Sequence, residues 1–258
     1  MNPAADKYTV ERITDVRAWT PSLFSFKTTR HRGFRFVAGQ FARLGVSNGE
    51  GGIVWRAYSI VSAPYDEHLE FYSIVVPGGE FTSRLAGLKG GDEILVEKLN
   101  YGYLTTDRFQ AGRDLWMLAT GTGLAPFISI LYDFPTWEQY DNLILVHSVR
   151  CRGELAYEET IRSFAGHDLF HEAPAELRYI QVVTREDVPG ALNARVTTLI
   201  ENGELERAAG LPLSQERARI MICGNPEMVE DARTLLLSRG FSLSRRGQPG
   251  HLALENLW

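Results

Sequence analysis

The chain contains 258 residues, more than the roughly 150 residues of a common domain, so its length predicts two domains with cores large enough to fold unaided. Hydrophobic residues make up 44% and charged residues 23%, with a net charge of −5, which excludes collagen-like, low-complexity and disordered chains. Two cysteines are too few for a four-thiolate iron–sulfur cluster or a cysteine-rich zinc site, so a redox centre would have to be an organic cofactor.

Targeting and assembly signals are sparse. No apolar run approaches the roughly 20 residues that span a bilayer, and the first residues lack the apolar core of a signal peptide. We therefore expect a cytoplasmic protein with no membrane or nucleic-acid partner and no metal, in which Cys151 and Cys223 are reduced. Nothing resembles a dimerisation motif, so a monomer is the simplest expectation.

The first half of the chain predicts short strands divided by Gly, Pro, Asn and Asp. The pattern favours strands over 7–16, 23–29, 41–46, 54–61, 69–76 and 92–99. A single helix near 82–88 begins at small polar residues and ends at two glycines. Six short strands without long helices predict a small antiparallel barrel or sandwich.

The second half shows a different pattern, in which strands alternate with helices. Continuous apolar runs predict buried strands over 115–120, 142–149, 178–184 and 218–224, and apolar recurrence at three and four residues predicts helices near 127–134, 156–166, 195–203 and 226–240. Alternation of this kind predicts βαβ units and a parallel sheet. We place the domains at residues 1–110 and 111–258.

A glycine turn follows the first of these buried strands. Gly121-Thr122-Gly123-Leu124-Ala125-Pro126 lies between the strand and a predicted helix. Glycines let the backbone turn tightly and approach a pyrophosphate, and Pro126 suits a first helical turn. A plain tight turn has the same composition, but the strand–turn–helix context favours a dinucleotide-binding loop.

Basic residues follow the next two strands. Arg150 stands where an acidic residue would accept the ribose hydroxyls of NAD, and an Arg at this place accommodates a 2′-phosphate. Thr184 and Arg185 end the following strand, and Arg195 lies ten residues further on. Each Arg alone reads as a solvated surface residue, but their recurrence beside a glycine turn favours NADP.

The barrel half carries signs of a second nucleotide. Arg56 and Tyr58 share one face of a predicted strand, either as a cross-strand pair or as a clamp for a phosphate and a ring. The segment from Pro77 to Ser83 is a glycine turn that enters a helix, a second potential phosphate site. Cys223 ends the last predicted parallel strand and is either core packing or a site residue, while Trp258 is either a docked tail or a stacking platform for a base.

Seven ordered motifs together resemble bacterial ferredoxin–NADP(+) reductases, and in particular the subclass that ends in Trp. They are RAYS, FYSIVVPGGEFTSRL, LWMLATGTGLAP, VHSVR, VVTRE, CGNPEM and RRGQPGHLALENLW. The resemblance implies a two-domain β + α/β architecture: an antiparallel six-stranded FAD-binding β-barrel followed by a parallel-sheet α/β NADP-binding domain, with a C-terminal tail that returns to the flavin. The implied cofactors are FAD and NADP(H).

The resemblance also implies roles for individual residues. The implied catalytic group is Tyr58 against the isoalloxazine, Ser59 near its reactive nitrogen, Cys223 at the hydride-transfer site, and Glu255 in proton exchange or nicotinamide placement. The implied FAD-binding residues are Arg56, Ala57, Tyr58, Ser59, Ser73, Ile74, Val75, Glu80, Phe81, Thr82, Thr122 and Trp258. The implied NADP-binding residues are Gly121, Thr122, Gly123, Arg150, Thr184, Arg185, Arg195, Cys223 and Gly224. Leu257 departs from the family, because many relatives have an aromatic residue there that covers the flavin.

The implied function is an NADPH-dependent flavoprotein reductase that exchanges a hydride with NADP(H) and single electrons with ferredoxin or flavodoxin. The alternatives are an NADPH-dependent flavin or quinone reductase, the reductase of an oxygenase system, and a nucleotide sensor without turnover. Electron carriers of this type are acidic, and no acid lies between Asp15 and Glu50. Candidate docking residues are Arg30, Arg32, Arg35, Arg239, Arg245 and Arg246, although a solvated loop and a general Arg bias explain these cations as well.

Overall fold

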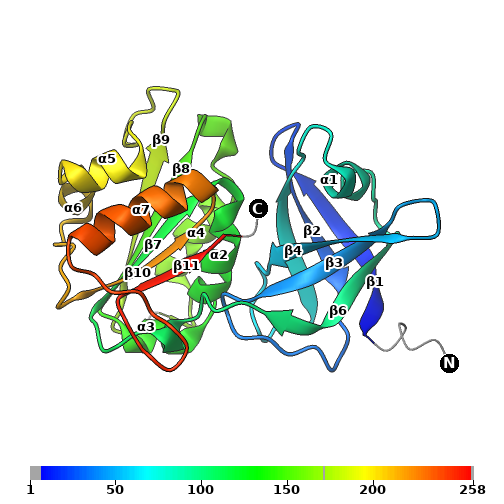
Figure 1. Ribbon diagram of the computed structural model, residues 1–258, viewed down its shortest axis with the longest axis horizontal. Helices are drawn as coiled ribbons and strands as arrows, with labels where there is room; N and C mark the ends of the chain where they lie inside the picture. The colour runs from blue at the N-terminus through cyan, green and yellow to red at the C-terminus, as the bar shows by residue number, and fades with distance from the viewer. Residues whose placement is uncertain (1–6, 171, 257–258) are drawn as a thin grey trace.

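The computed structural model describes residues 7–170 and 172–256 and has two domains that lie side by side (Figure 1). Among these residues, the first domain contains one antiparallel sheet in the order β4-β3-β6-β1-β2-β5. A bridge between Ile60 and Phe71 joins the end of β4 to β5, which closes the sheet into a barrel. The strands are β1 Tyr8–Ala18, β2 Leu23–Thr29, β3 Phe41–Ser47, β4 Ile53–Ser59, β5 His68–Ile74 and β6 Glu93–Tyr101. The predicted antiparallel six-stranded barrel is confirmed.

Alternation of side chains builds the barrel core. On β6, Ile94 and Val96 are 1% exposed and point inward, whereas Glu93 points to solvent. The helix α1 Glu80–Leu85 closes one end of the barrel, and its two buried residues, Phe81 and Leu85, lie one turn apart. This helix begins two residues before the predicted start, because the burial of Phe81 draws its first turn toward the core.

The second domain contains a parallel sheet in the order β11-β10-β7-β8-β9 within the described residues. Its strands are β7 Asp114–Thr120, β8 Asn142–Val149, β9 Glu176–Val183, β10 Ala218–Cys223 and β11 Leu252–Glu255. The α-helices are α2 Ala125–Leu131, α3 Phe134–Gln139, α4 Glu158–Ser163, α5 Val196–Glu201, α6 Glu204–Ala209 and α7 Pro226–Ser238. Short 3-10 turns are η1 Thr106–Arg108, η2 Gly121–Leu124, η3 Arg152–Glu154 and η4 Phe164–Gly166.

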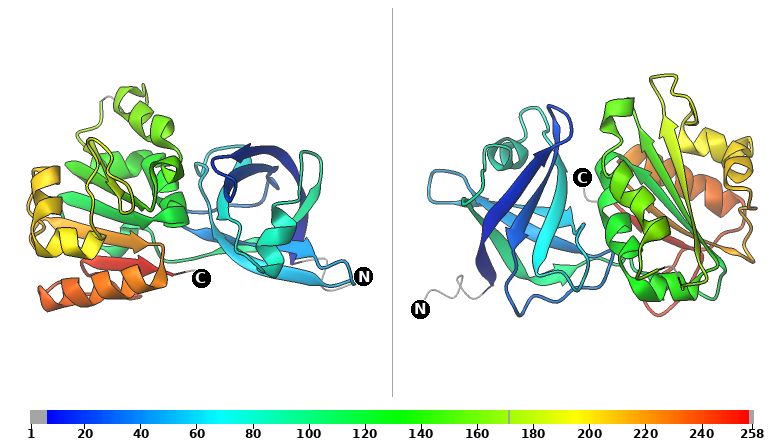
Figure 2. Two further views of the ribbon diagram at one scale, coloured as in Figure 1. Left: turned by 90° about the horizontal axis from the view of Figure 1, so that it is seen from above. Right: turned by 180° about the vertical axis from the view of Figure 1, so that it is seen from behind.

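Helices cover both faces of the parallel sheet (Figure 2). Leu115 and Met117 of β7 pack with residues of α2 and α4 on the face toward the barrel domain. Trp116 and Leu118 of the same strand pack with α5, α6 and α7 on the opposite face. A strand buried on both faces has a continuous apolar sequence. The sequence of these strands therefore does not indicate which side chains point to which face of the sheet.

The C-terminal segment adds a strand that the sequence did not predict. β11 pairs in parallel with β10, so that Ile220 lies opposite Leu252 and Cys223 lies opposite Glu255. The prediction that the strand ending at Cys223 is the last of the sheet was therefore wrong. A strand of four residues has too little local pattern to be recognised, and its pairing depends on β10, which ends some thirty residues earlier.

Several contacts fix one domain against the other. Buried Arg219 of β10 donates hydrogen bonds to the carbonyls of Gln110 and Ala111, the segment between the two sheets. The hydroxyl of Tyr157, just before α4, donates to a Glu70 carboxylate oxygen of β5 at 2.8 Å. No helix within the described ranges is long and apolar enough to cross a membrane.

Candidate functional site

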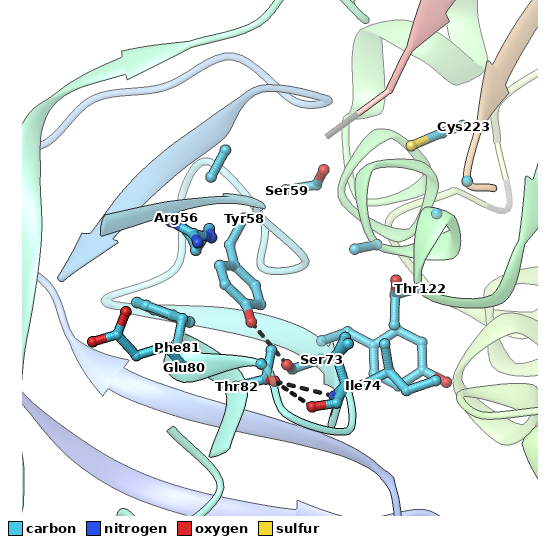
Figure 3. Close-up of a pocket in the computed structure, with 17 residues that line it drawn as sticks. Arg56, Tyr58, Ser59, Ser73, Ile74, Glu80, Phe81, Thr82, Thr122 and Cys223 are labelled. Carbon is cyan, nitrogen blue, oxygen red and sulfur yellow. Dashed lines mark hydrogen bonds between the residues drawn. The ribbon is translucent and has the colours of Figure 1, made fainter. Parts of the chain in front are cut away.

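The first cleft lies between β4, β5 and α1 of the barrel and the loops that follow β7 and β10 (Figure 3). It brings together most of the residues that the sequence assigned to FAD. Its lining is Arg56, Ala57, Tyr58, Ser59, Tyr72, Ser73, Ile74, Val76, Gly79, Glu80, Phe81, Thr82, Thr122, Gly123, Ala125, Cys223 and Gly224. Val75 does not line the cleft and packs against the barrel core instead. Leu257 and Trp258 lie outside the described residues.

Tyr58 forms one wall of this cleft. Its ring packs against Phe81, with centroids 5.5 Å apart, and its hydroxyl shares a 2.9 Å hydrogen bond with Ser73 Oγ (Figure 3). Burial raises the pKa of Tyr58 to about 12, so the phenol stays protonated at neutral pH. The result is a fixed aromatic surface with a neutral hydrogen-bonding edge.

The opposite side of the cleft carries ionisable groups. Ser59 Oγ donates a hydrogen bond of 3.1 Å to Glu255 Oε1, and Cys223 sits opposite Glu255 on the neighbouring strand. Burial raises the pKa of Glu255 to about 7, and the Ser59 hydrogen bond acts in the opposite direction. Burial also raises the pKa of the Cys223 thiol well above its usual value, so that this group is an uncharged thiol rather than a nucleophilic thiolate.

The loop before α1 is held by Thr82. Its Oγ1 accepts a 3.0 Å hydrogen bond from the backbone N–H of Val76 and donates to the Val76 carbonyl at 3.4 Å. A Cβ at Gly79 would lie 2.8 Å from Thr82 Oγ1 and 3.0 Å from the Val76 carbonyl oxygen. Glycine at this position therefore lets the loop fold close to the start of the helix.

The second cleft lies at the carboxyl ends of β7, β8, β9 and β10. This is the edge of a parallel sheet at which nucleotides bind in α/β domains. Its lining is Leu23, Ile74, Thr120, Gly121, Thr122, Ser148, Val149, Arg150, Glu154, Thr184, Arg185, Arg195, Val196, Thr197, Asn225, Glu227, Met228 and Asp231. The basic residues that the sequence assigned to NADP are thus in one cleft, whereas Gly123, Cys223 and Gly224 line the first one.

The glycines of the predicted dinucleotide loop have separate roles. Gly121 adopts a positive φ of 53°, which few other residues tolerate. A Cβ on Gly123 would overlap the backbone of Cys223 and lie 2.6 Å from the Cα of Gly224. Gly123 is therefore required for close packing between the loops after β7 and β10, a role that the sequence motif alone did not indicate.

The arginines of the second cleft differ in how firmly they are held. The backbone N–H of Arg185 donates to the carbonyl of Arg150 at 2.9 Å, which places the two residues side by side. Arg150 is also bound by Glu154, which accepts from its Nε at 3.0 Å and from its Nη2 at 2.5 Å. Arg185 and Arg195 are exposed.

The two clefts adjoin each other. Ile74 and Thr122 line both of them, so these two side chains lie between the clefts. Figure 3 shows Ile74 and Thr122 next to each other, from the barrel and from the loop after β7. The sequence placed both residues among the FAD contacts but gave no sign that they separate two ligand spaces.

Sequence reasoning missed several lining residues. Tyr72 and Val76 line the first cleft, and Glu154, Asn225, Glu227 and Asp231 line the second. The hydroxyl of Tyr72 is buried and has no hydrogen-bond partner in the part of the chain that the structure describes. Tyr72 adjoins the predicted contact Ser73, so an extension of that motif by one residue would have found it.

The candidate docking arginines fall into two groups. Arg30 is half-buried and donates to the carbonyls of Phe34, Pro64 and Asp66, so it ties two loops of the barrel together. Arg239, directly after α7, donates to the Ile200 carbonyl at 2.9 Å and thereby caps α5. The other four, Arg32, Arg35, Arg245 and Arg246, are exposed. Among the residues described, no group of three or more His, Cys, Asp or Glu side chains is arranged to hold a metal.

Comparison with known proteins assigns the family. The model "Oxidoreductase FAD-binding domain" matches residues 8–98, and the model "Oxidoreductase NAD-binding domain" matches residues 117–234. A ferredoxin–NADP reductase of Pseudomonas aeruginosa is 45% identical over 249 residues, which is 95% of each chain. The chain belongs to the ferredoxin–NADP reductase family.

Other members of the family agree with this assignment. A flavodoxin/ferredoxin–NADP reductase of Escherichia coli is 40% identical over 248 residues, covering 96% of this chain and 97% of its own. The crystal structure of a ferredoxin–NADP⁺ reductase from Neisseria gonorrhoeae with bound FAD and NADP superimposes with a TM-score of 0.91. That protein is 38% identical and the match covers 98% of this chain and 99% of the other. The predicted ferredoxin–NADP reductase resemblance and the two-domain fold are confirmed.

Proposed function

We propose that this member of the ferredoxin–NADP reductase family transfers electrons between NADP(H) and ferredoxin or flavodoxin through FAD. The observation that carries the proposal is that two clefts along the boundary of the domains share Ile74 and Thr122. An enzyme that transfers a hydride must hold its nicotinamide against a flavin, and positioning is its main contribution. The names of the relatives include ferredoxin in one case and both flavodoxin and ferredoxin in another, which supports both proteins as partners.

The first cleft fits a flavin nucleotide. Its walls combine the ring of Tyr58 with a buried Tyr72 hydroxyl that lacks a partner in residues 7–170 and 172–256, and a ligand can supply that partner. Arg56 and the Gly79 turn offer contacts for a pyrophosphate. The chemistry that FAD would supply in this cleft is acceptance of a hydride as two electrons and their release one at a time.

The chain's own residues position the reactants and exclude water. Tyr58 supplies a flat surface held by Ser73, and Cys223 supplies a small uncharged part of the wall of the first cleft. Glu255 accepts a hydrogen bond from Ser59 and has a pKa of about 7, so it can hold or release a proton near neutral pH beside this cleft. Arg150, Arg185 and Arg195 in the second cleft carry the positive charge that favours NADP(H), with its 2′-phosphate, over NAD(H).

The division at residues 1–110 and 111–258 is part of the proposal. It is supported by a barrel sheet that ends at Tyr101 and a parallel sheet that begins at Asp114. We further propose a monomer, and the net charge of −5 disfavours a nucleic-acid partner.

An anaerobic titration tests the function directly. The purified FAD-loaded protein is mixed with NADPH or NADH while the flavin absorbance is recorded. We expect NADPH to bleach the flavin at lower concentration than NADH, and turnover with ferredoxin or flavodoxin to exceed turnover with free flavin or quinones. If NADPH did not bleach the flavin, the result would contradict the proposal and favour a nucleotide sensor without turnover. Turnover only with free flavin or quinones would indicate a flavin or quinone reductase.

A further inference from the structure

Arg150 is held more completely than the other two arginines of the second cleft. Its backbone N–H donates to Glu154 Oε2 at 3.0 Å, and its carbonyl accepts from Arg185. Its side chain meets the same carboxylate through Nε and Nη2. Within the described residues, by contrast, no hydrogen bond or ion pair fixes the side chain of Arg185 or Arg195.

The geometry of this pair leaves one edge of the guanidinium available. Glu154 occupies the edge formed by Nε and Nη2. The other edge, formed by Nη1 and the second hydrogen of Nη2, has no hydrogen-bond partner in the described part of the chain. An arginine with a free planar edge of this kind matches a phosphate with two parallel hydrogen bonds.

Glu154 is well placed to hold this geometry. It ends the 3-10 turn η3, and its backbone N–H donates to the Cys151 carbonyl at 3.0 Å, so the turn brings the carboxylate back to Arg150. Its side chain is 16% exposed, against 49% for Arg150, so the carboxylate lies behind the guanidinium rather than in open solvent. Burial acts to raise the pKa of Glu154, but the hydrogen bonds and the charge of Arg150 together outweigh it and lower the pKa, which keeps Glu154 charged at neutral pH.

We infer that Glu154 is a positioning residue that presents Arg150 to the 2′-phosphate of NADP(H), an inference that rests on the proposed function. A carboxylate in a phosphate-binding cleft would otherwise repel the ligand, and its simple removal would improve binding. The two roles therefore predict opposite signs for the same substitution. A positioning residue strengthens binding because the arginine is already ordered before the phosphate arrives.

The test is an equilibrium titration of the FAD-loaded protein with NADP⁺ and with NAD⁺, in which binding is measured by calorimetry or by the change in flavin absorbance. Glu154→Gln keeps the shape of the side chain but turns an amide N–H₂ toward the arginine and breaks the paired hydrogen bonds. We expect the Kd for NADP⁺ to rise about two- to tenfold, the range that corresponds to ordering one flexible side chain. The Kd for NAD⁺ should not change.

Two matched variants separate positioning from charge. Asp231→Asn removes an acidic group from the same cleft without contact to Arg150, so it should not raise the Kd for NADP⁺. In the Arg150→Ala background, Glu154→Gln should no longer weaken NADP⁺ binding, because the positioning role requires the guanidinium.

Four outcomes would overturn the inference: tighter NADP⁺ binding by Glu154→Gln, an equal loss for NAD⁺, an equal loss in Asp231→Asn, or an undiminished effect without Arg150. An unaltered chain that binds NADP⁺ no better than NAD⁺ would contradict the proposed function and with it this inference. The four outcomes named first contradict the inference alone.

Discussion

Ser59 and Glu255 are 196 positions apart in the chain and share a 3.1 Å hydrogen bond that joins the barrel to the last strand of the parallel sheet. Glu255 is 7% exposed, and burial raises the pKa of its carboxyl group to about 7. Gly102 adjoins the same carboxyl, since a Cβ there would lie 3.0 Å from Glu255 Oε2. A titratable group thus sits at the boundary of the domains beside the proposed flavin cleft.

The pH dependence of catalysis should follow this hydrogen bond. The bond from Ser59 lowers the pKa of Glu255, so Ser59→Ala should raise that pKa further above its value of about 7. Turnover of NADPH with a non-protein acceptor, measured from pH 5 to 9, should show an ionisation that moves upward in Ser59→Ala and disappears in Glu255→Gln. A profile that keeps the same ionisation in both variants would exclude Glu255 as its source.

The stability of the fold should respond to the same group. The pKa of Glu255 is raised from 4.5 to about 7 in the folded state, so the folded protein binds the proton more tightly than the unfolded chain. The stabilisation is complete below about pH 4.5 and is lost as the pH rises through about 7, with a total on the order of 3 kcal/mol. Urea unfolding of Glu255→Gln should lack this component, and an identical pH dependence in the two proteins would contradict it.

Arg150→Ala should impair NADPH much more than NADH. Loss of a charge-assisted phosphate contact costs about 1.5–3 kcal/mol, or roughly a factor of 10 to 150 in KM for NADPH. Arg152→Ala is the matched control, since Arg152 pairs with Glu158 at 2.7 Å and does not line the cleft. Equal losses for the two nucleotides in Arg150→Ala would remove this residue from the 2′-phosphate site.

The base of β7 contains a buried carboxylate whose loss should destabilise the second domain. Asp114 is fully buried, accepts from Arg217 Nε at 2.9 Å and Nη2 at 3.0 Å, and accepts from Asn142 at 2.7 Å. Asp114→Ala should lower the free energy of unfolding by about 3 kcal/mol, which is near the lower end of the range of losses caused by breaking a buried ion pair. The lower end applies because the side chain of Arg217 keeps 32% exposure and can be hydrated after the loss.

An exposed ion pair nearby provides the comparison. Arg113 and Asp141 also form a short pair of 2.5 Å, but their side chains are 63% and 43% exposed. Arg113→Ala should therefore cost less than about 1 kcal/mol. Urea unfolding of both variants measures the difference, and similar losses would show that burial does not set the strength of the Asp114 pair.

Gly123→Ala should damage the junction of the two clefts. The added Cβ would overlap the Cys223–Gly224 backbone, which is held by the parallel pairing of β10 with β7. We expect a loss of at least about 2 kcal/mol of stability, or of nucleotide binding if the loop moves instead. Gly153→Ala is the control, because a Cβ there meets nothing within 4 Å. Unchanged stability and NADPH affinity in Gly123→Ala would contradict the close approach.

Electron transfer to the acidic carrier should depend on the exposed arginines of the barrel. The carbonyl of Arg35 accepts from Asn100 on β6, which places its loop beside the end of the barrel that approaches Glu255. Combined Arg32→Glu and Arg35→Glu should slow flavodoxin reduction about tenfold or more at low salt, and the effect should shrink as salt is added. The same charge reversal at Arg245 and Arg246, on the other domain, is the matched control. If only that second pair of substitutions slowed reduction, docking would belong to the other domain.

The sequence by itself determined the two kinds of domain and much of the cofactor chemistry. Alternating short strands before residue 101 and continuous apolar strands after residue 114 follow from local burial, so the chain pattern records them. The grouping of Arg150, Thr184 and Arg185 was also predictable, because parallel strands bring their carboxyl ends to one edge of a sheet. These features depend on neighbours in sequence or on topology alone.

Only the tertiary structure decided which side chains act on one another. Four-residue β11 has no pattern of its own and exists because β10 pairs with it, which brings Glu255 to Ser59. The tertiary structure likewise engaged Arg30 with carbonyls of the barrel loops, where the sequence had offered it for docking. Hydrogen bonds of this kind depend on distances between segments that are remote in the chain and on how the two domains pack. The sequence therefore shows which functional groups the chain contains, and the packing of the two domains determines which of these groups contact one another.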